Sequence, residues 1–232
     1  MGRSPARPSI SPTPSSPGRR ARNGSSASPE APSHRPKPIA RRELPIDTKA
    51  LARYLIGKTL VRELPEGILS GRIVETEAYV VGDAAGHAYR GMTPRNRALF
   101  LERGHAYVYL AYGISYMLNV SSEAPGIGAG VLIRALEPRE GIPIMKRNRG
   151  IEHLRDLARG PGRLASALRI DRRLDGLDLC REGPLWLGRG DAESGAIGQS
   201  MRIGITRDAD RLLRFYVRDS PFVSGPRSLN TP

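Results

Sequence analysis

Several segments in which apolar and polar residues alternate are separated by links of only a few residues. The clearest pair covers residues 106–112 and 116–121, which are three residues apart. Antiparallel strands can be joined by a tight turn, whereas parallel strands need a crossover of roughly a dozen or more residues. Because other segments show helical periodicity, these links predict a mixed α/β (α+β) chain whose sheet is largely antiparallel and flanked by helices.

The periodicity locates the individual elements. The expected strands are residues 59–64, 71–80, 106–112, 116–121, 130–136, 201–206 and 213–217. The expected helices are residues 46–56, 93–104, 138–149, 151–158 and 161–168. The first helix has Asp47 as its N-cap and Gly57 just beyond its end, and the second begins where Thr93 precedes a proline.

The chain divides into a tail and one domain. Residues 1–43 contain nine Pro and nine Ser, and their only aliphatic side chains larger than Ala are Ile10 and Ile39. Such a segment buries too little apolar surface to offset its chain entropy, so we expect a disordered basic tail, with an organellar transit peptide as the alternative. The remainder suffices for one core, which we place at residues 44–224, followed by a C-terminal extension at residues 225–232.

Composition excludes several classes of protein. The single Cys rules out an internal disulfide framework and a multi-Cys zinc cluster, and the sequence has no apolar run long enough to predict a membrane span. The net charge of +14, from 37 Lys and Arg against 23 Asp and Glu, favours a polyanionic partner. No cluster of His, Cys and carboxylate residues indicates a metal site, and we expect no cofactor.

The segment 71–80 carries the densest chemistry. Alternation along a strand puts Glu75, Glu77 and Tyr79 on one face, together with Ile73. The Cα atoms of the two glutamates are then roughly 6–7 Å apart, a separation that does not exclude paired-carboxylate hydrolysis of sugars. On pattern alone, a solvated strand face is the simpler interpretation.

A second dense segment, residues 105–119, contains four tyrosines that include Tyr107, Tyr109 and Tyr112. The first two share a strand face, and the third lies at the turn before Gly113. Aromatic platforms suit the stacking of nucleic-acid bases. Tyrosine is also common in ordinary sheet cores, which is the alternative.

These motifs, taken together and in order, closely resemble the alkyladenine (3-methyladenine) DNA glycosylase family. The resemblance runs from about Ala40 to Ser224 and rests on seven segments: Gly71–Tyr79, Thr93–Arg97, Tyr107–Gly113, Leu118–Ser122, Val131–Pro138, Leu157–Leu164 and Arg214–Arg218. It implies a single domain with a curved antiparallel sheet. It also implies cleavage of the N-glycosidic bond of damaged purines in DNA, after the nucleotide has been flipped out of the duplex.

The resemblance implies the catalytic residues. Glu77 activates the water that attacks the sugar C1′, and its carboxylate also stabilises oxocarbenium charge. Arg134 and the main-chain carbonyl of Ile203 help to hold that water. Glu75 is then a neighbour with a structural or tuning role. Independently, an arginine between Leu132 and Leu136 on a predicted core face needs a partner, because an unpaired buried charge is very costly.

The resemblance also implies the residues that handle the base. Tyr79 and Tyr109 stack on opposite faces of the flipped base, and His87 lies at its edge. Asn119 is positioned so that it would clash with the 2-amino group of guanine. Tyr112 fills the gap that the flipped nucleotide leaves in the duplex.

The sequence thus predicts a monofunctional DNA glycosylase that acts as a monomer on double-stranded DNA containing damaged purines. Its substrates would be 3-methyladenine, 7-methylguanine and hypoxanthine, and it would leave an abasic site. None of the four lysines lies in the strand motifs, so we expect no Schiff base and no strand cleavage. Two alternatives remain: a non-catalytic module that binds damaged DNA, and a glycosidase that uses Glu75 and Glu77 on free saccharides. The expected location is the cytoplasm of a bacterium, or the nucleus or an organelle of a eukaryote.

Overall fold

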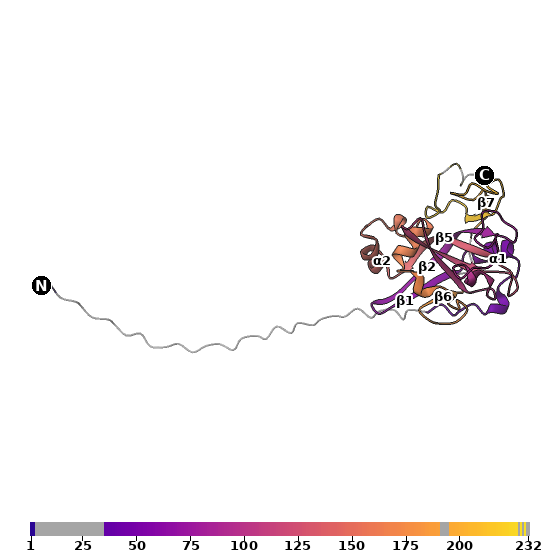
Figure 1. The fold of residues 1–232 in the computed structure, drawn as a ribbon. Coiled ribbons are helices and arrows are strands. Elements are labelled where there is room, and N and C mark those ends of the chain that lie inside the picture. Colours follow the sequence, from indigo (N-terminus) through magenta and orange to yellow (C-terminus); the bar gives the residue numbers. More distant parts are fainter. Residues whose placement is uncertain (3–34, 191–194, 227, 229, 231–232) are drawn as a thin grey trace. The chain divides into compact units, whose positions relative to one another are not determined.

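The computed structural model describes residues 1–2, 35–190, 195–226, 228 and 230 (Figure 1). The described residues form eight strands: β1 (Thr59–Leu64), β2 (Gly67–Tyr79), β3 (Ala106–Ala111), β4 (Ser115–Ser121), β5 (Gly130–Glu140), β6 (Leu185–Gly188), β7 (Ile197–Ser200) and β8 (Arg214–Val217). They also form three α-helices: α1 (Thr48–Leu55), α2 (Ile142–Arg149) and α3 (Pro161–Ala167). Four 3₁₀ helices complete the set: Arg41–Glu43, Arg97–Phe100, Leu154–Asp156 and Arg172–Leu174.

The strands join one curved sheet in which the neighbours are antiparallel, so the predicted α+β class is confirmed. The main path runs β3-β4-β5-β2-β1-β6, and the paired strands β7 and β8 attach to β2 through β8. Along one edge of β2 the neighbour changes: residues 67–72 pair with β1, whereas residues 75–77 pair with β8. β5 follows the other edge, and Figure 1 shows β2 and β5 at the centre of the molecule.

A bulge in β2 coincides with this change of neighbour. The register between β2 and β5 shifts between Ile73 and Glu75 and again between Glu75 and Thr76. Bulges bend a strand and redirect its side chains. The bend carries the second half of β2, with Glu75 and Glu77, between β5 and β8.

The helices cover the sheet through short apolar faces. α1 buries Thr48, Leu51, Ala52 and Leu55, a spacing of three and four residues that places them on one side of the helix. As predicted, the Asp47 side chain caps α1 by accepting a hydrogen bond from a backbone N–H of the first turn. α1 packs on β2, while α3 packs on β4 and β5 and α2 packs on α3.

One expected helix, residues 93–104, is wrong, because only Arg97–Phe100 is helical. The Asn96 side chain, which is buried, explains the difference. Its Oδ1 accepts hydrogen bonds from the N–H and the hydroxyl of Thr93 at 2.6 and 2.9 Å, and its Nδ2 donates to the carbonyl of His87 at 2.8 Å. Side-chain bonds of this kind compete with a helix, and here they fold the segment into a loop.

Two further helix boundaries need correction. Of the helix expected at residues 138–149, the first residues continue β5, and α2 begins only after Gly141, whose φ is 70°. The helix expected at residues 151–158 contains only the 3₁₀ turn Leu154–Asp156. The helix expected at residues 161–168 is confirmed as α3.

The strand expected at residues 201–206 is also wrong, whereas β6 and β7 were not predicted. The backbone N–H of Ile203 donates to the carboxylate of Glu77 rather than to a neighbouring strand, and Gly204 has a φ of 78°. The other expected strands are confirmed, with β2 and β5 longer than predicted.

Residues 35–43, which we expected to belong to the tail, are part of the folded domain. Residues 3–34 lie outside the described residues, but residues 35–43 pack against the sheet rather than forming part of a disordered tail. Ile39 is wholly buried, its N–H bonds to the carbonyl of Leu187, and the Trp186 indole donates to the carbonyl of Pro36. A single large aliphatic residue, aided by these backbone bonds, is enough to dock the segment. Within the part of the chain that is described, no helix has the length and apolar character needed to cross a membrane.

Candidate active site

A cavity of about 390 Å³ opens where the end of β2 meets β3, β4 and β5. Seven of the eight residues predicted from the sequence line it: Tyr79, His87, Tyr109, Tyr112, Asn119, Arg134 and Ile203. The eighth, Glu77, lies directly behind this lining and is fully buried. The fold therefore gathers in one place residues that are more than 120 positions apart in the sequence.

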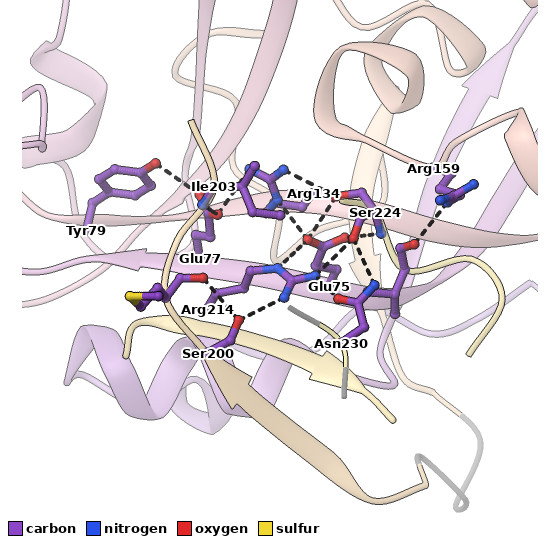
Figure 2. A network of polar contacts seen from close by, with 12 residues as sticks. Glu75, Glu77, Tyr79, Arg134, Arg159, Ser200, Ile203, Arg214, Ser224 and Asn230 are labelled. Atoms are coloured by element: carbon purple, nitrogen blue, oxygen red, sulfur yellow. Dashed lines mark hydrogen bonds and ion pairs between the residues drawn. The ribbon is translucent and has the colours of Figure 1, made fainter. Parts of the chain in front are cut away.

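Glu77 is held by three donors, which Figure 2 shows converging on its carboxylate. Oε1 accepts from the backbone N–H of Ile203 at 2.7 Å and lies 3.1 Å from Nη1 of Arg134. Oε2 accepts from the hydroxyl of Tyr79 at 3.0 Å. These donors stabilise the carboxylate and fix its orientation. Ile203 reaches Glu77 through its N–H, so the predicted role of its carbonyl remains a prediction.

Arg134 joins the two glutamates of β2. Its Nε donates to Oε1 of Glu75 at 2.8 Å, while Nη1 faces Glu77. Although burial alone would lower it, the charges of Glu77 and Glu75 hold the pKa of Arg134 above its ordinary value. The sequence predicted that Arg134 needs a partner, and the structure provides two carboxylates.

Glu75 is surrounded by donors of its own. Its Oε1 accepts from Arg134, from Nε of Arg214 at 2.7 Å and from the Ser224 hydroxyl at 2.9 Å, while Oε2 accepts from the Ser224 N–H at 2.7 Å. Burial alone would raise the pKa of Glu75, but Arg134 and Arg214 hold it below its ordinary value. We call Glu75, Glu77, Arg134 and Arg214 the cavity floor.

The floor decides between the earlier interpretations of β2. Glu75 and Glu77 are both 0% exposed, so the solvated-face interpretation is wrong. A glycosidase acting through two carboxylates needs one of them protonated, with a raised pKa. The pKa of Glu75 is lowered instead, which argues against that alternative.

One wall of the cavity is a cluster of aromatic rings. Tyr107 and Tyr109 are nearly parallel with centroids 5.3 Å apart, and the His87 ring meets Tyr109 edge-on at 4.4 Å. Nδ1 of His87 is 2.9 Å from the Tyr107 hydroxyl. Burial, and then the nearby Arg95, lower the pKa of His87, so its imidazole is neutral at neutral pH. Sequence analysis placed Tyr107 beside Tyr109 but gave it no role at the site.

Tyr79 is supported from behind by a buried ion pair that sequence analysis missed. The guanidinium of Arg202 lies 4.7 Å from the centroid of the Tyr79 ring. Two nitrogens of the same guanidinium pair with the carboxylate of Asp83, and one of them also donates to the carbonyl of Ala78 at 3.0 Å. Burial and the charge of Glu77 raise the pKa of Tyr79, so its hydroxyl stays protonated and keeps donating to that carboxylate. The one feature of the sequence that pointed to Arg202 was its position next to Ile203, a predicted site residue.

Asn119 occupies the inner wall. It is 6% exposed, its Nδ2 donates to the carbonyl of Tyr107 at 3.3 Å, and it is paired with Leu132 of β5. Its amide is therefore held at the cavity wall, while its predicted role against the 2-amino group of guanine remains a prediction.

Tyr112 lies at the rim, at the turn between β3 and β4, and is 90% exposed. Tyr112 and Gly113 both have positive φ, 51° and 70°, and the N–H of Ile114 bonds to the carbonyl of Ala111 at 2.9 Å. Ile114 is 83% exposed. We call residues 112–114 the hairpin tip. The alternative of a core tyrosine is wrong, while the insertion of Tyr112 into DNA remains a prediction.

Comparison with known proteins shows the family of this chain. The family described as "Methylpurine-DNA glycosylase (MPG)" matches residues 42–221. A protein of Mesorhizobium japonicum named "Putative 3-methyladenine DNA glycosylase" is 81% identical over 192 residues, which cover 83% of this chain and 92% of that protein. Proteins with the same name from Paraburkholderia phytofirmans and Methanocella arvoryzae are 53% and 48% identical, covering 83% and 76% of this chain and 90% of each relative. The chain therefore belongs to the methylpurine-DNA glycosylase family and is a DNA glycosylase of DNA repair.

Proposed function

We propose that this enzyme flips damaged purines out of double-stranded DNA and hydrolyses their N-glycosidic bond, with 3-methyladenine and 7-methylguanine as its main substrates. The observation that carries the proposal is the position of Glu77, oriented by Arg134 and the Ile203 N–H directly behind an aromatic cavity. Because Glu77 lies directly behind this cavity, a nucleotide can bring its sugar close to the carboxylate only after leaving the base stack.

In the proposed reaction, Glu77 accepts a proton from a water molecule as the oxygen of that water attacks C1′. The C1′–N bond breaks and its electron pair goes to the purine. An alkylated purine is cationic, so it leaves as a neutral base without first being protonated. Arg134 and the Ile203 N–H bind Oε1, while Oε2 accepts only the Tyr79 hydroxyl among the described residues and retains a site for the water proton.

Hypoxanthine is a neutral leaving group, and its release is faster when an acid protonates it. Neither candidate acid suits this task, because Glu75 has a lowered pKa and bonds to arginines, and His87 has a lowered pKa and is neutral. We therefore propose hypoxanthine as a slow substrate. Asn119, on the inner wall, would disfavour the 2-amino group that guanine and 7-methylguanine share. The cationic charge of 7-methylguanine makes it a good leaving group and compensates for this contact, whereas undamaged guanine lacks that charge and is rejected.

The test is single-turnover base release from duplexes that contain 7-methylguanine, hypoxanthine or undamaged guanine, at neutral pH and with saturating enzyme. We expect release in the order 7-methylguanine, then hypoxanthine, with guanine retained. Equal rates for the first two would contradict a reaction driven by the charge of the leaving group. Tight binding of damaged duplex without release of any base would favour the non-catalytic module. Sizing of the enzyme on DNA tests the proposed monomer.

A further inference from the structure

The chain after β8 returns to the cavity floor. Ser224 and Asn230, which we call the C-terminal clasp, contact Glu75 and Arg214, as Figure 2 shows. Sequence analysis placed the end of the domain at Ser224 and treated residues 225–232 as an extension. Both clasp residues also lie beyond residue 221, where the family match ends.

Ser224 completes the set of acceptors around Arg134. Its hydroxyl donates to Oε1 of Glu75 at 2.9 Å and accepts from Nη2 of Arg134 at 3.2 Å. Each of the three nitrogens of Arg134 thus has an acceptor of its own: Glu75 for Nε, Glu77 for Nη1 and Ser224 for Nη2. A guanidinium bound at all three nitrogens has a fixed plane, and that plane sets the direction in which Nη1 meets Glu77.

Asn230 holds Ser224 in place from the far side. Nη2 of Arg214 donates to Oδ1 of Asn230 at 2.7 Å and to the carbonyl of Ser224 at 3.1 Å, and Asn230 Nδ2 donates to that carbonyl at 3.3 Å. Nη1 of Arg214 donates to the hydroxyl of Ser200 at 2.8 Å, three residues before Ile203. The clasp therefore contacts one support of Oε1 of Glu77 directly, the guanidinium of Arg134, and through Arg214 it reaches the end of β7 at Ser200, three residues before the other support, Ile203.

We propose that Ser224 is a positioning residue for the hydrolytic step, and that Asn230 supports it. The clasp touches neither the base nor the water; it fixes Arg134, which in turn fixes the carboxylate of Glu77. Catalysis depends steeply on such placement, because a displacement of about 1 Å can lower a rate about 100-fold. The inference rests on the proposed function, since it assigns the clasp to the same reaction.

The experiment compares Ser224→Ala and Ser224→Thr with wild type, all as full chains. We measure single-turnover release of 7-methylguanine and, separately, the Kd for the same duplex. Ser224→Ala removes the acceptor of Nη2, so the rate should fall about tenfold, within the range expected for misplaced catalytic groups, while Kd changes less than twofold. Ser224→Thr restores a hydroxyl and should recover most of the rate, which a general loss of stability would not explain.

Ser220→Ala is the matched control. Ser220 lies in the same segment, and its hydroxyl accepts only from the N–H of Phe222, at 3.3 Å, among the described residues. This variant should excise at the wild-type rate. If Ser224→Ala does not fold, Asn230→Ala decides the matter, with an expected loss of about threefold from a looser second contact.

Each outcome bears on the proposal. A wild-type rate in folded Ser224→Ala, or equal losses of rate and affinity, would overturn the positioning role while leaving the proposed function intact. A rate that Thr does not recover would also contradict it. If wild type itself releases no base, the proposed function fails and the role of the clasp in it fails too.

Discussion

The cavity floor and the hairpin tip are at opposite extremes of burial, although both belong to one site. Glu75 and Glu77 are 0% exposed, whereas Tyr112 is 90% exposed. The floor is fixed by side chains, since four arginine and glutamate residues from three strands form ion pairs with one another. The tip is fixed by its backbone, through a turn with two positive φ angles. The difference shows that the groups to which we assign the chemistry are already oriented in the free protein, while the group to which we assign the DNA contact is exposed.

The two regions also differ in what a substitution costs. Removing one partner of a buried ion pair leaves an uncompensated charge and costs about 3–5 kcal/mol. Removing an exposed side chain costs almost nothing in stability, because it contacts mainly solvent in the free protein. Substitutions in the floor should therefore change rate or stability, whereas substitutions in the tip should change only the encounter with DNA.

The largest expected effect comes from Glu77→Gln. The amide keeps the size of the side chain but accepts no proton, so single-turnover excision should fall about 10²- to 10⁴-fold, the range of general-base catalysis. Affinity for damaged duplex should stay within a few-fold of wild type, as measured by titration. Glu63→Gln, the same change at a 43% exposed side chain of β1, is the control and should leave both the excision rate and the affinity unchanged. An affinity loss as large as the rate loss would make Glu77 a structural residue.

Glu75→Gln should act on stability. Because the folded pKa of Glu75 lies below its ordinary value of 4.5, this carboxylate contributes stability above about pH 4.5 that is lost as the pH falls through the folded pKa. Denaturant unfolding should show the variant about 3–5 kcal/mol less stable than wild type at pH 7. This difference in the free energy of unfolding between variant and wild type should become smaller toward acid pH. Glu152→Gln, at an 85% exposed side chain, is the control and should change stability by less than about 1 kcal/mol. A stability difference that does not change with pH would contradict the lowered pKa of Glu75.

Tyr112→Ala should separate the tip from the floor. Loss of stacking against the duplex is worth about 1–3 kcal/mol, so excision from duplex DNA at subsaturating enzyme should fall about 5- to 100-fold. Excision from a single-stranded oligonucleotide, which has no gap to fill, should change little. The melting temperature should not move, because Tyr112 is exposed. Equal losses on both substrates would place Tyr112 in the chemistry rather than in flipping.

The smallest effect is expected from deletion of residues 2–34, which removes five arginines. Fewer phosphate contacts should flatten the salt dependence of DNA binding, while the saturated excision rate stays unchanged. A deletion of residues 2–40 also removes buried Ile39 and should lower the melting temperature. Equal stability of the two deletions would contradict the packing of residues 35–43.

Local patterns predicted the parts of the fold that depend on neighbours in sequence. β1 is a short run that contains Leu and the β-branched Thr59 and Val61, and α1 has both a capping residue and one apolar face, so both were located correctly. β6 was missed because it is only four residues long and contains no β-branched residue, which leaves too short a pattern to read. The segment 93–104 was misread because the competing hydrogen bonds of Asn96 depend on where a loop nine residues away comes to lie.

The candidate site divides in the same way. The alternation of β2 brought Glu75, Glu77 and Tyr79 together, but the choice of Glu77 came from the family resemblance. The partners that distinguish the two glutamates lie far along the chain: Arg214 is 139 residues from Glu75, and Ser224 is 149. Contacts at such separations follow from the assembled sheet and leave no signal in a local pattern.

The left-handed backbone at the hairpin tip affects how fast the enzyme could examine the base pairs of DNA one after another. β3 and β4 are paired as far as Ala111 and Ser115, so the backbone that carries Tyr112 is already in its turn conformation before the enzyme meets DNA. A flexible loop would have to order itself at each base pair, which takes on the order of nanoseconds to microseconds. A preset tip adds no such delay. In the base flipping that we propose, the time spent at each base pair would then be set by how readily that pair opens, and the enzyme would stop at weakened pairs.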